Sequence, residues 1–173
     1  EFKEKNLPIL LISSHISWWD GFWALYLNLL LFKRKFHFMM LEDQLRKHWY
    51  FNYAGGFSVK KKSRSVIESL LYAGELLNDN KNIVLIFPQG AIYSQYNRFI
   101  RFEKGIDKIL SNLNCAIQII MLVNLTDYFS NKKPVLYNYI KEYEDGQNNI
   151  LELEKQYQTF YLHCLELQSK IKS

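Results

Sequence analysis

The 173-residue chain can bury a core without a disulfide or a metal, because a domain of this size removes roughly 70% of its unfolded surface from water. Its hydrophobic fraction of 49% and mean hydropathy of −0.20 exclude a bundle of membrane spans. A formal net charge of +5 favours anionic partners such as lipid headgroups, nucleotides or nucleic acid. Cys115 and Cys164 fit neither a zinc site nor a disulfide framework, which predicts reduced thiols in a cytoplasmic protein.

Short apolar runs alternate with longer helical patterns along the chain. In chain order we expect a strand at 8–13, a helix at 18–32, a strand at 36–41, a helix at 42–53, a strand at 56–59, a helix at 65–77, a strand at 83–87, a helix at 102–113, strands at 116–123 and 135–140, and a helix at about 149–170. This alternation predicts an α/β fold with a mostly parallel or mixed sheet flanked by helices. Because no repeat or linker interrupts it, residues 1–173 are expected to form a single domain.

A histidine and an aspartate follow the first expected strand. His15 comes directly after that strand, and Asp20 lies at the start of the next helix. In parallel sheets, ligands bind beyond the carboxyl ends of the strands. A carboxylate that reaches an imidazole at this position fixes the tautomer of the imidazole and stabilises the imidazolium. The pair therefore predicts a general base for a hydroxyl nucleophile. The competing interpretation is that His15 caps the strand end and Asp20 interacts with the helix dipole.

Two further segments carry groups that suit a polar ligand. Gln89 and Gly90 follow the strand at 83–87, where an amide can hydrogen-bond a substrate and a glycine permits close approach of the backbone. An ordinary turn is the competing interpretation there. A basic run follows the expected strand at 56–59 and contains Lys60, Lys61, Lys62 and Arg64. It suits a phosphate or an anionic lipid, or forms a solvated turn.

Taken in order, these segments resemble the signature blocks of the lysophospholipid acyltransferase family, which includes the glycerol-phosphate acyltransferases. SHISWWD resembles the first block, His-x-x-x-x-Asp, and GGFSVKK resembles the second, a glycine and short strand before a phosphate-binding basic residue. FPQG resembles the third block, usually Phe-Pro-Glu-Gly, while RFEKG and QIIMLV resemble later stretches. The resemblance covers about residues 8–123, and residues 124–173 carry no matching motif.

The resemblance implies an acyltransferase similar to the 1-acylglycerol-3-phosphate acyltransferases, with an acyltransferase-like fold. His15 would deprotonate an acceptor hydroxyl and Asp20 would orient the imidazole. The hydroxyl would then attack a fatty acyl thioester and release coenzyme A or acyl carrier protein, without a metal or a bound cofactor. The residues implied to bind the acceptor are Lys60, Lys61, Lys62, Gln89 and Gly90.

The chain departs from the family pattern in its second and third blocks, and its fourth block lacks the usual proline. Gln89 stands where Glu is usual, and residues 91–93 read Ala-Ile-Tyr where Thr-Arg-Ser is common. Lys61 replaces an Arg and so lacks the two-pronged geometry that suits phosphate. These departures leave the acceptor open between lysophosphatidic acid, a lysolipid with another headgroup, and a hydroxylated pigment or aminolipid.

The resemblance also implies a membrane lipid as acceptor and a peripheral position on the cytoplasmic side of a membrane, or an anchor in a segment absent from this chain. The apolar stretch at 21–32 is shorter than the roughly 20 residues that a membrane span requires. Aromatic residues between 18 and 26 suit an acyl groove, a membrane interface or the core equally.

Three alternative functions compete with acyl transfer. The first is a non-catalytic lipid-binding module of the same fold, which the departure at Gln89 favours. The second is an ester hydrolase, which is disfavoured because the chain has no Gly-x-Ser-x-Gly motif. The third is a nucleic-acid binder, which is disfavoured because the basic run has no stacking aromatics interleaved with it.

Overall fold

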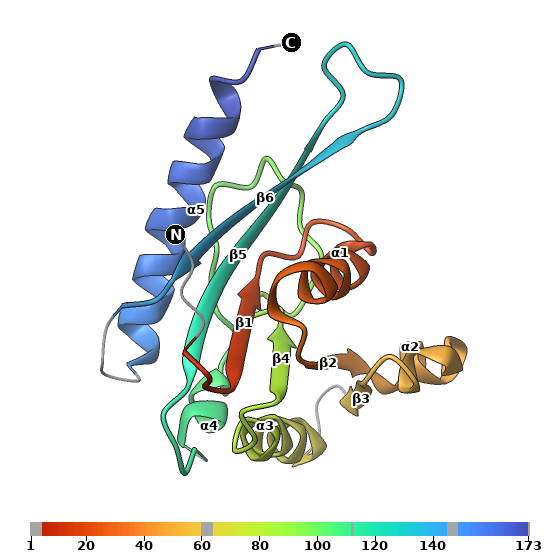
Figure 1. The fold of residues 1–173 in the computed structure, drawn as a ribbon, viewed down its shortest axis with the longest axis vertical. Helices are drawn as coiled ribbons and strands as arrows, with labels where there is room; N and C mark the ends of the chain where they lie inside the picture. The colour runs from red at the N-terminus through yellow and green to blue at the C-terminus, as the bar shows by residue number, and fades with distance from the viewer. Residues whose placement is uncertain (1–4, 60–63, 112, 145–148, 173) are drawn as a thin grey trace.

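A six-stranded sheet organises the molecule, with the strand order β3-β2-β4-β1-β5-β6 (Figure 1). The computed structural model describes residues 5–59, 64–111, 113–144 and 149–172. The strands are β1 (Ile9–Ser13), β2 (Lys35–Leu41), β3 (Gly56–Val59), β4 (Asn82–Ile86), β5 (Gln118–Asp127) and β6 (Val135–Glu142). The pairs among β1 to β5 are parallel, whereas β6 pairs antiparallel with β5. The predicted α/β class with a mixed sheet is thus confirmed.

The centre of the sheet is buried on both faces. Every residue of β1 and β4 is buried, as expected for parallel strands that helices cover on both sides. Because side chains alternate along a strand, Leu10 and Ile12 join one hydrophobic cluster and Ile9 and Leu11 join the other. The apolar run of the first strand therefore supplies both cores.

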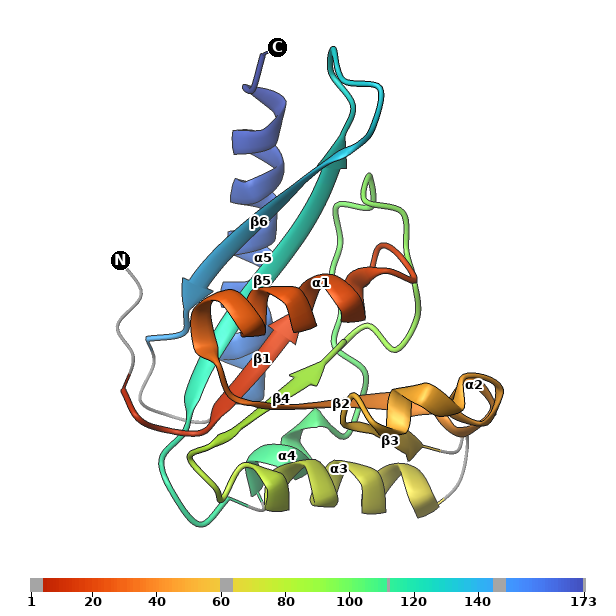
Figure 2. The ribbon, with the colours of Figure 1, turned by 45° about the vertical axis from the view of Figure 1, so that its right-hand side comes forward.

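Helices form a layer on each face of the sheet. The helical segments are α1 (Asp20–Leu27), the π-helical turn η1 (Asn28–Phe32), α2 (Glu42–Lys47), the 3₁₀ turn η2 (Trp49–Asn52), α3 (Arg64–Leu76), α4 (Ile106–Ser111) and α5 (Ile150–Ser169). Buried side chains of α3, α4 and α5 pack in one cluster, while those of α1, α2 and η2 pack in the other. Figure 2 shows α1 crossing in front of β1, with α5 behind β5 and β6.

Four expected elements differ from the structure by more than two residues at one end. The helix expected at 18–32 starts at Asp20 and becomes a π-helical turn after Leu27. The helix expected at 42–53 stops at Lys47, because the backbone of His48 leaves the helical region at φ −123° and ψ 58°. The strand expected at 116–123 extends to Asp127, where antiparallel pairing with β6 continues.

The helix expected at 102–113 begins only at Ile106. Gly105 just before it adopts φ of +105°, outside the helical region, so the helix does not extend back through this residue. The backbone N–H groups of the preceding segment have partners elsewhere. Glu103 donates to the carbonyl oxygen of Pro88 at 2.8 Å, and Phe102 donates to the Glu154 carboxylate at 3.2 Å. Residues 87–105 consequently form a long connection between β4 and α4 beside the carboxyl ends of the strands (Figure 2).

Candidate active site

His15 and Asp20 meet at the carboxyl end of β1. The chain turns back between the strand and α1, so the Nδ1 atom of His15 lies 2.9 Å from Oδ2 of Asp20. The same oxygen accepts the backbone N–H groups of Ile16 at 2.7 Å and Ser17 at 2.8 Å. The Asp20 side chain is fully buried, whereas that of His15 is 21% exposed. The two residues that the sequence singled out therefore form a hydrogen-bonded pair.

This geometry determines which imidazole nitrogen can act as a base. A carboxylate oxygen accepts hydrogen bonds, so Nδ1 of His15 carries the hydrogen that points to Asp20. The other ring nitrogen, Nε2, is left with a free lone pair. Two backbone donors and one ring donor hold Asp20 in place, so the carboxylate is fixed relative to the imidazole. Such a pair can remove a proton from a hydroxyl group.

Residues from the end of β4 contact His15 from the other side. The ring of Phe87 stacks on the imidazole with centroids 4.1 Å apart and planes inclined by 15°. Gln89 is only 4% exposed, and its Oε1 accepts the backbone N–H of His15 at 2.8 Å. The backbone N–H of Tyr93 donates to the carbonyl oxygen of His15 at 2.9 Å. The turn after β4 thus packs directly against the base.

Gly90 lies in the same turn and adopts a backbone conformation that favours glycine, with φ of +65°. A Cβ atom at this position would lie 3.0 Å from Cγ of Glu103. Gly90 itself is exposed, whereas its neighbour Gln89 points inward. Of the two residues in this turn that were predicted to touch the acceptor, only Gly90 is therefore exposed to solvent.

The predicted phosphate-binding residues Lys60, Lys61 and Lys62 lie outside the described residues, so their role stays a prediction. Gly55, the first of the two glycines before them, is required by the local backbone geometry. Gly55 adopts φ of +87°, and a Cβ atom there would overlap the carbonyl oxygen of Phe36. Glycine at this position therefore allows β3 to approach the neighbouring strand β2 closely.

Side chains of α5 anchor the connection at 87–105, a role that the sequence did not reveal. Gln158 accepts the backbone N–H of Ile100 at 2.7 Å and donates to the carbonyl oxygen of Arg98 at 2.9 Å. Gln95, within the connection, exchanges hydrogen bonds with the backbone of Thr126 at the end of β5. These pairs are 31 to 60 positions apart in the sequence, so no local pattern signals them.

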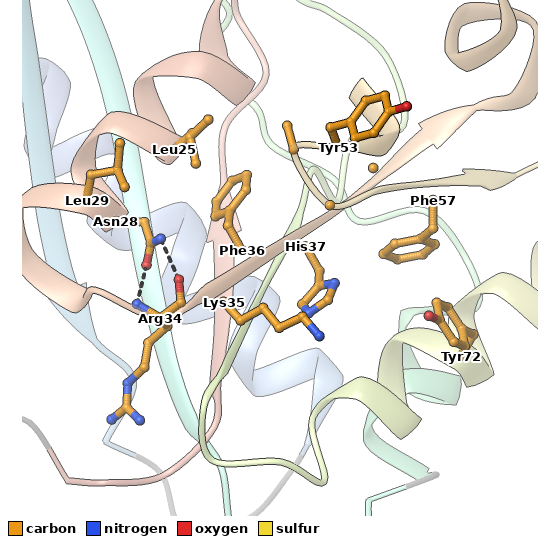
Figure 3. A pocket seen from close by; sticks show the side chains of 13 residues that line it. Leu25, Asn28, Leu29, Arg34, Lys35, Phe36, His37, Tyr53, Phe57 and Tyr72 are labelled. Carbon is orange, nitrogen blue, oxygen red and sulfur yellow. Dashed lines mark hydrogen bonds between the residues drawn. The ribbon is translucent and has the colours of Figure 1, made fainter. Parts of the chain in front are cut away.

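A hollow of about 680 Å³ lies beside the start of β2, at the end of the sheet opposite to His15 (Figure 3). The side chain of Phe36 points to one side of β2, and His37 points to the other, toward Phe57. His37 contacts the Asn82 side chain at 3.3 Å, and burial lowers the pKa of its imidazole. None of the residues predicted to carry the chemistry lines this hollow. Among the described residues, no cluster of His, Cys, Asp or Glu could hold a metal ion.

Comparison with known proteins identifies the family. A family model described as Acyltransferase matches residues 1–123, the segment that runs from before β1 into β5. The chain belongs to the acyltransferase family. The resemblance inferred from the sequence motifs is thereby confirmed at the level of the family. No curated protein and no solved structure gives a significant match.

The matched segment of this acyltransferase contains His15, Asp20 and Gln89. The unmatched remainder contributes most of the β5–β6 hairpin and all of α5. The family therefore accounts for the residues at the carboxyl ends of β1 and β4. The helix that anchors the 87–105 connection lies beyond the matched segment.

Proposed function

We propose that this acyltransferase moves a fatty acyl group from an acyl thioester to a hydroxyl of a lysophospholipid-like acceptor. The donor would be acyl-CoA or an acylated acyl carrier protein, with no resident metal or cofactor. The observation that carries the proposal is the 2.9 Å contact between Nδ1 of His15 and Oδ2 of Asp20 at the carboxyl end of β1. Such a contact prepares the opposite nitrogen to accept a proton.

The proposed reaction moves one proton and exchanges two bonds to the acyl carbon. Nε2 of His15 removes the proton of the acceptor hydroxyl while the hydroxyl oxygen attacks the thioester carbonyl carbon. The C–S bond then breaks, and the protonated imidazole returns the proton to the leaving thiolate. Asp20 favours the imidazolium that exists between these steps, because opposite charges in hydrogen-bonding contact stabilise each other.

A non-catalytic lipid-binding module is the second candidate function. The buried position of Gln89 removes one reason for it, because an inward-pointing amide does not by itself change what the site binds. A base held by a buried carboxylate is also unnecessary for binding alone. Acyl transfer is therefore the function that the geometry supports better.

We further propose that the enzyme binds a membrane peripherally, at its cytoplasmic side, through an aromatic surface that starts at Trp18, three positions after His15. This surface consists of Trp18, Trp19, Trp49, Tyr50 and Tyr53, which are between 43% and 85% exposed. The buried Phe51 joins its two parts, with ring centroids 6.1 Å from Trp18 and 4.8 Å from Tyr50. Trp and Tyr are enriched where proteins meet the headgroup region of a bilayer. No helix in the described segments is long and apolar enough to cross a bilayer.

The activity is tested by thiol release from acyl-CoA and acylated acyl carrier protein, with and without a panel of lysolipid acceptors. His15→Ala should lower the acceptor-dependent rate by roughly 10²–10⁴-fold, because a general base contributes about that much. His163→Ala removes an exposed histidine on α5 and serves as the matched control. Lipid binding without thiol release from any donor, or equal release by wild type and His15→Ala, would support the binding module instead.

Membrane binding is tested by sedimentation with vesicles of phosphatidylcholine, with and without added phosphatidylglycerol. Replacing both Trp49 and Tyr53 by Ala should reduce the bound fraction, because two large exposed rings are lost. Tyr128→Ala removes an exposed ring at the end of the β5–β6 hairpin and is the control. Equal losses in the two variants would contradict a specific role for the aromatic surface.

A further inference from the structure

The backbone of the proposed base is held by a side chain from a distant strand end. The N–H of His15 donates to Oε1 of Gln89 at 2.8 Å, across a separation of 74 positions. A backbone N–H can only donate, so the atom facing it has to be the amide oxygen. Gln89 is 4% exposed, which excludes water from this bond and makes its loss costly.

Residue 15 is consequently fixed at four points. Its ring nitrogen binds Asp20, its N–H binds Gln89, and its carbonyl oxygen accepts from Tyr93. The ring also stacks on Phe87. Three of these four contacts come from the turn and connection after β4, and only Asp20 belongs to the same local segment as the base.

We infer that Gln89 is a positioning residue for His15, which holds the backbone of the base in register with Asp20 and contributes no charge of its own. The inference rests on the proposed function. It assigns to Gln89 a role different from the acceptor contact that the family resemblance implies. The acceptor's polar end would then meet other groups, such as the exposed Gly90.

The neutrality of the amide has a consequence for catalysis. A carboxylate at this position would accept the same hydrogen bond from His15, because both groups offer an sp² oxygen. A carboxylate would also place a negative charge on the group that binds the backbone N–H of His15, and a nearby negative charge favours a protonated imidazole. A protonated imidazole cannot act as a base. Gln89 therefore provides the acceptor atom while Asp20 supplies the charge in direct contact with the ring.

Two substitutions separate positioning from acceptor binding. Gln89→Leu removes the oxygen that accepts from His15, and we expect kcat to fall by roughly 10–100-fold with an unchanged KM for the acceptor, as for a displaced catalytic group. Gln89→Glu retains the acceptor atom. We expect it to recover most of the rate at high pH and to move the acid limb of the pH–rate profile to higher pH. Gln156→Leu on α5 is the control, since its amide binds only Glu152 among the contacts described.

A second measurement does not depend on turnover. The ring signals of His15 are followed by NMR as a function of pH and assigned by their loss in His15→Ala. The titration midpoint should move upward in Gln89→Glu and not in Gln156→Glu, with circular dichroism confirming that both variants fold. Absence of turnover in the wild type would count against the proposed function alone, because this titration still reports on Gln89.

The positioning role would be overturned by either of two results. One is a raised KM for the acceptor at unchanged kcat in Gln89→Leu, which would show that the amide binds substrate. The other is a Gln89→Leu protein with the kcat of the wild type, which would show that the hydrogen bond to His15 is not needed. A Gln89→Glu protein whose pH–rate profile and His15 titration both coincide with those of the wild type would refute the role of the neutral amide.

Discussion

The hydroxyl of Tyr157 donates to the carbonyl oxygen of Leu122 at 2.7 Å. The same oxygen accepts the backbone N–H of Ser14 at 3.3 Å, and Ser14 directly precedes His15. Tyr157 lies on α5, whereas Leu122 belongs to β5. The C-terminal helix therefore reaches a carbonyl group one hydrogen bond away from the neighbour of the proposed base. A part of the chain without a recognised motif supports the site in this way.

Tyr157→Phe should lower the free energy of unfolding by about 1 kcal/mol, because one buried hydrogen bond is lost while Leu122 keeps its bond from Ser14. Burial raises the pKa of the Tyr157 hydroxyl well above its usual value, so the group is neutral and serves as a donor. Urea denaturation measures the change. Tyr26→Phe, at an exposed tyrosine of α1, is the control and should have almost no effect. An equally small change in both variants would show that the bond to Leu122 contributes nothing.

Two substitutions of Asp20 should have different consequences. Asp20→Asn retains a side-chain oxygen for the N–H groups of Ile16 and Ser17 but loses the negative charge, so kcat should fall by at least 100-fold in a folded protein. Asp20→Ala leaves those partly buried donors without their partner and should also destabilise the fold, by about 1–3 kcal/mol. Kinetics and thermal unfolding of the two variants separate these effects. Equal activity of Asp20→Asn and wild type would rule out the charged pair as the catalytic unit.

Gln158→Ala should loosen the connection at 87–105 while leaving the sheet intact. The substitution removes the acceptor for Ile100 N–H and the donor to the Arg98 carbonyl oxygen. We expect hydrogen exchange at the Ile100 amide to accelerate by about 10–100-fold, with little change for the amides of β1. Gln156→Ala on the same helix is the matched control. Unchanged exchange at Ile100 would mean that the remaining contacts hold the connection by themselves.

Stability should fall at alkaline pH because buried groups on α5 resist ionisation. Burial raises the pKa of Cys164 from 9.0 to about 12 and that of Tyr161 from 10.0 to about 12. The unfolded chain ionises first, so the stabilisation is fully present below about pH 9 and is lost as the pH rises toward 12. Each group lowers the free energy of unfolding by at most about 1.4 kcal/mol per pH unit in that range.

Cys164→Ala tests this pH dependence. Removing the thiol should make the fall in stability between pH 9 and 12 shallower, even though the smaller side chain lowers stability at every pH. Urea denaturation at several pH values measures the slope. Cys115→Ala, at the exposed cysteine, should leave the slope unchanged. Identical slopes for wild type and Cys164→Ala would refute the assignment to Cys164.

The sequence predicted those parts of the site that depend on short segments. His15 and Asp20 are five positions apart, and the strand before them is a plain apolar run, so their meeting could be anticipated. The inward orientation of Gln89 could not, because it depends on β4 lying beside β1. The late start of α4 at Ile106 could not be anticipated either, because Gly105 before it adopts φ of +105°, which lies outside the helical region.

The two kinds of support for His15 also differ in when they can arise during synthesis of the chain. The contact with Asp20 needs only the first turn after β1, whereas the bond to Gln89 requires β4 to have been made and docked. A nascent chain that ends before residue 89 already contains His15 and Asp20, but not the amide that fixes the backbone of His15. The backbone of the proposed base is therefore expected to become fixed only after residue 89 has been made and β4 has docked beside β1.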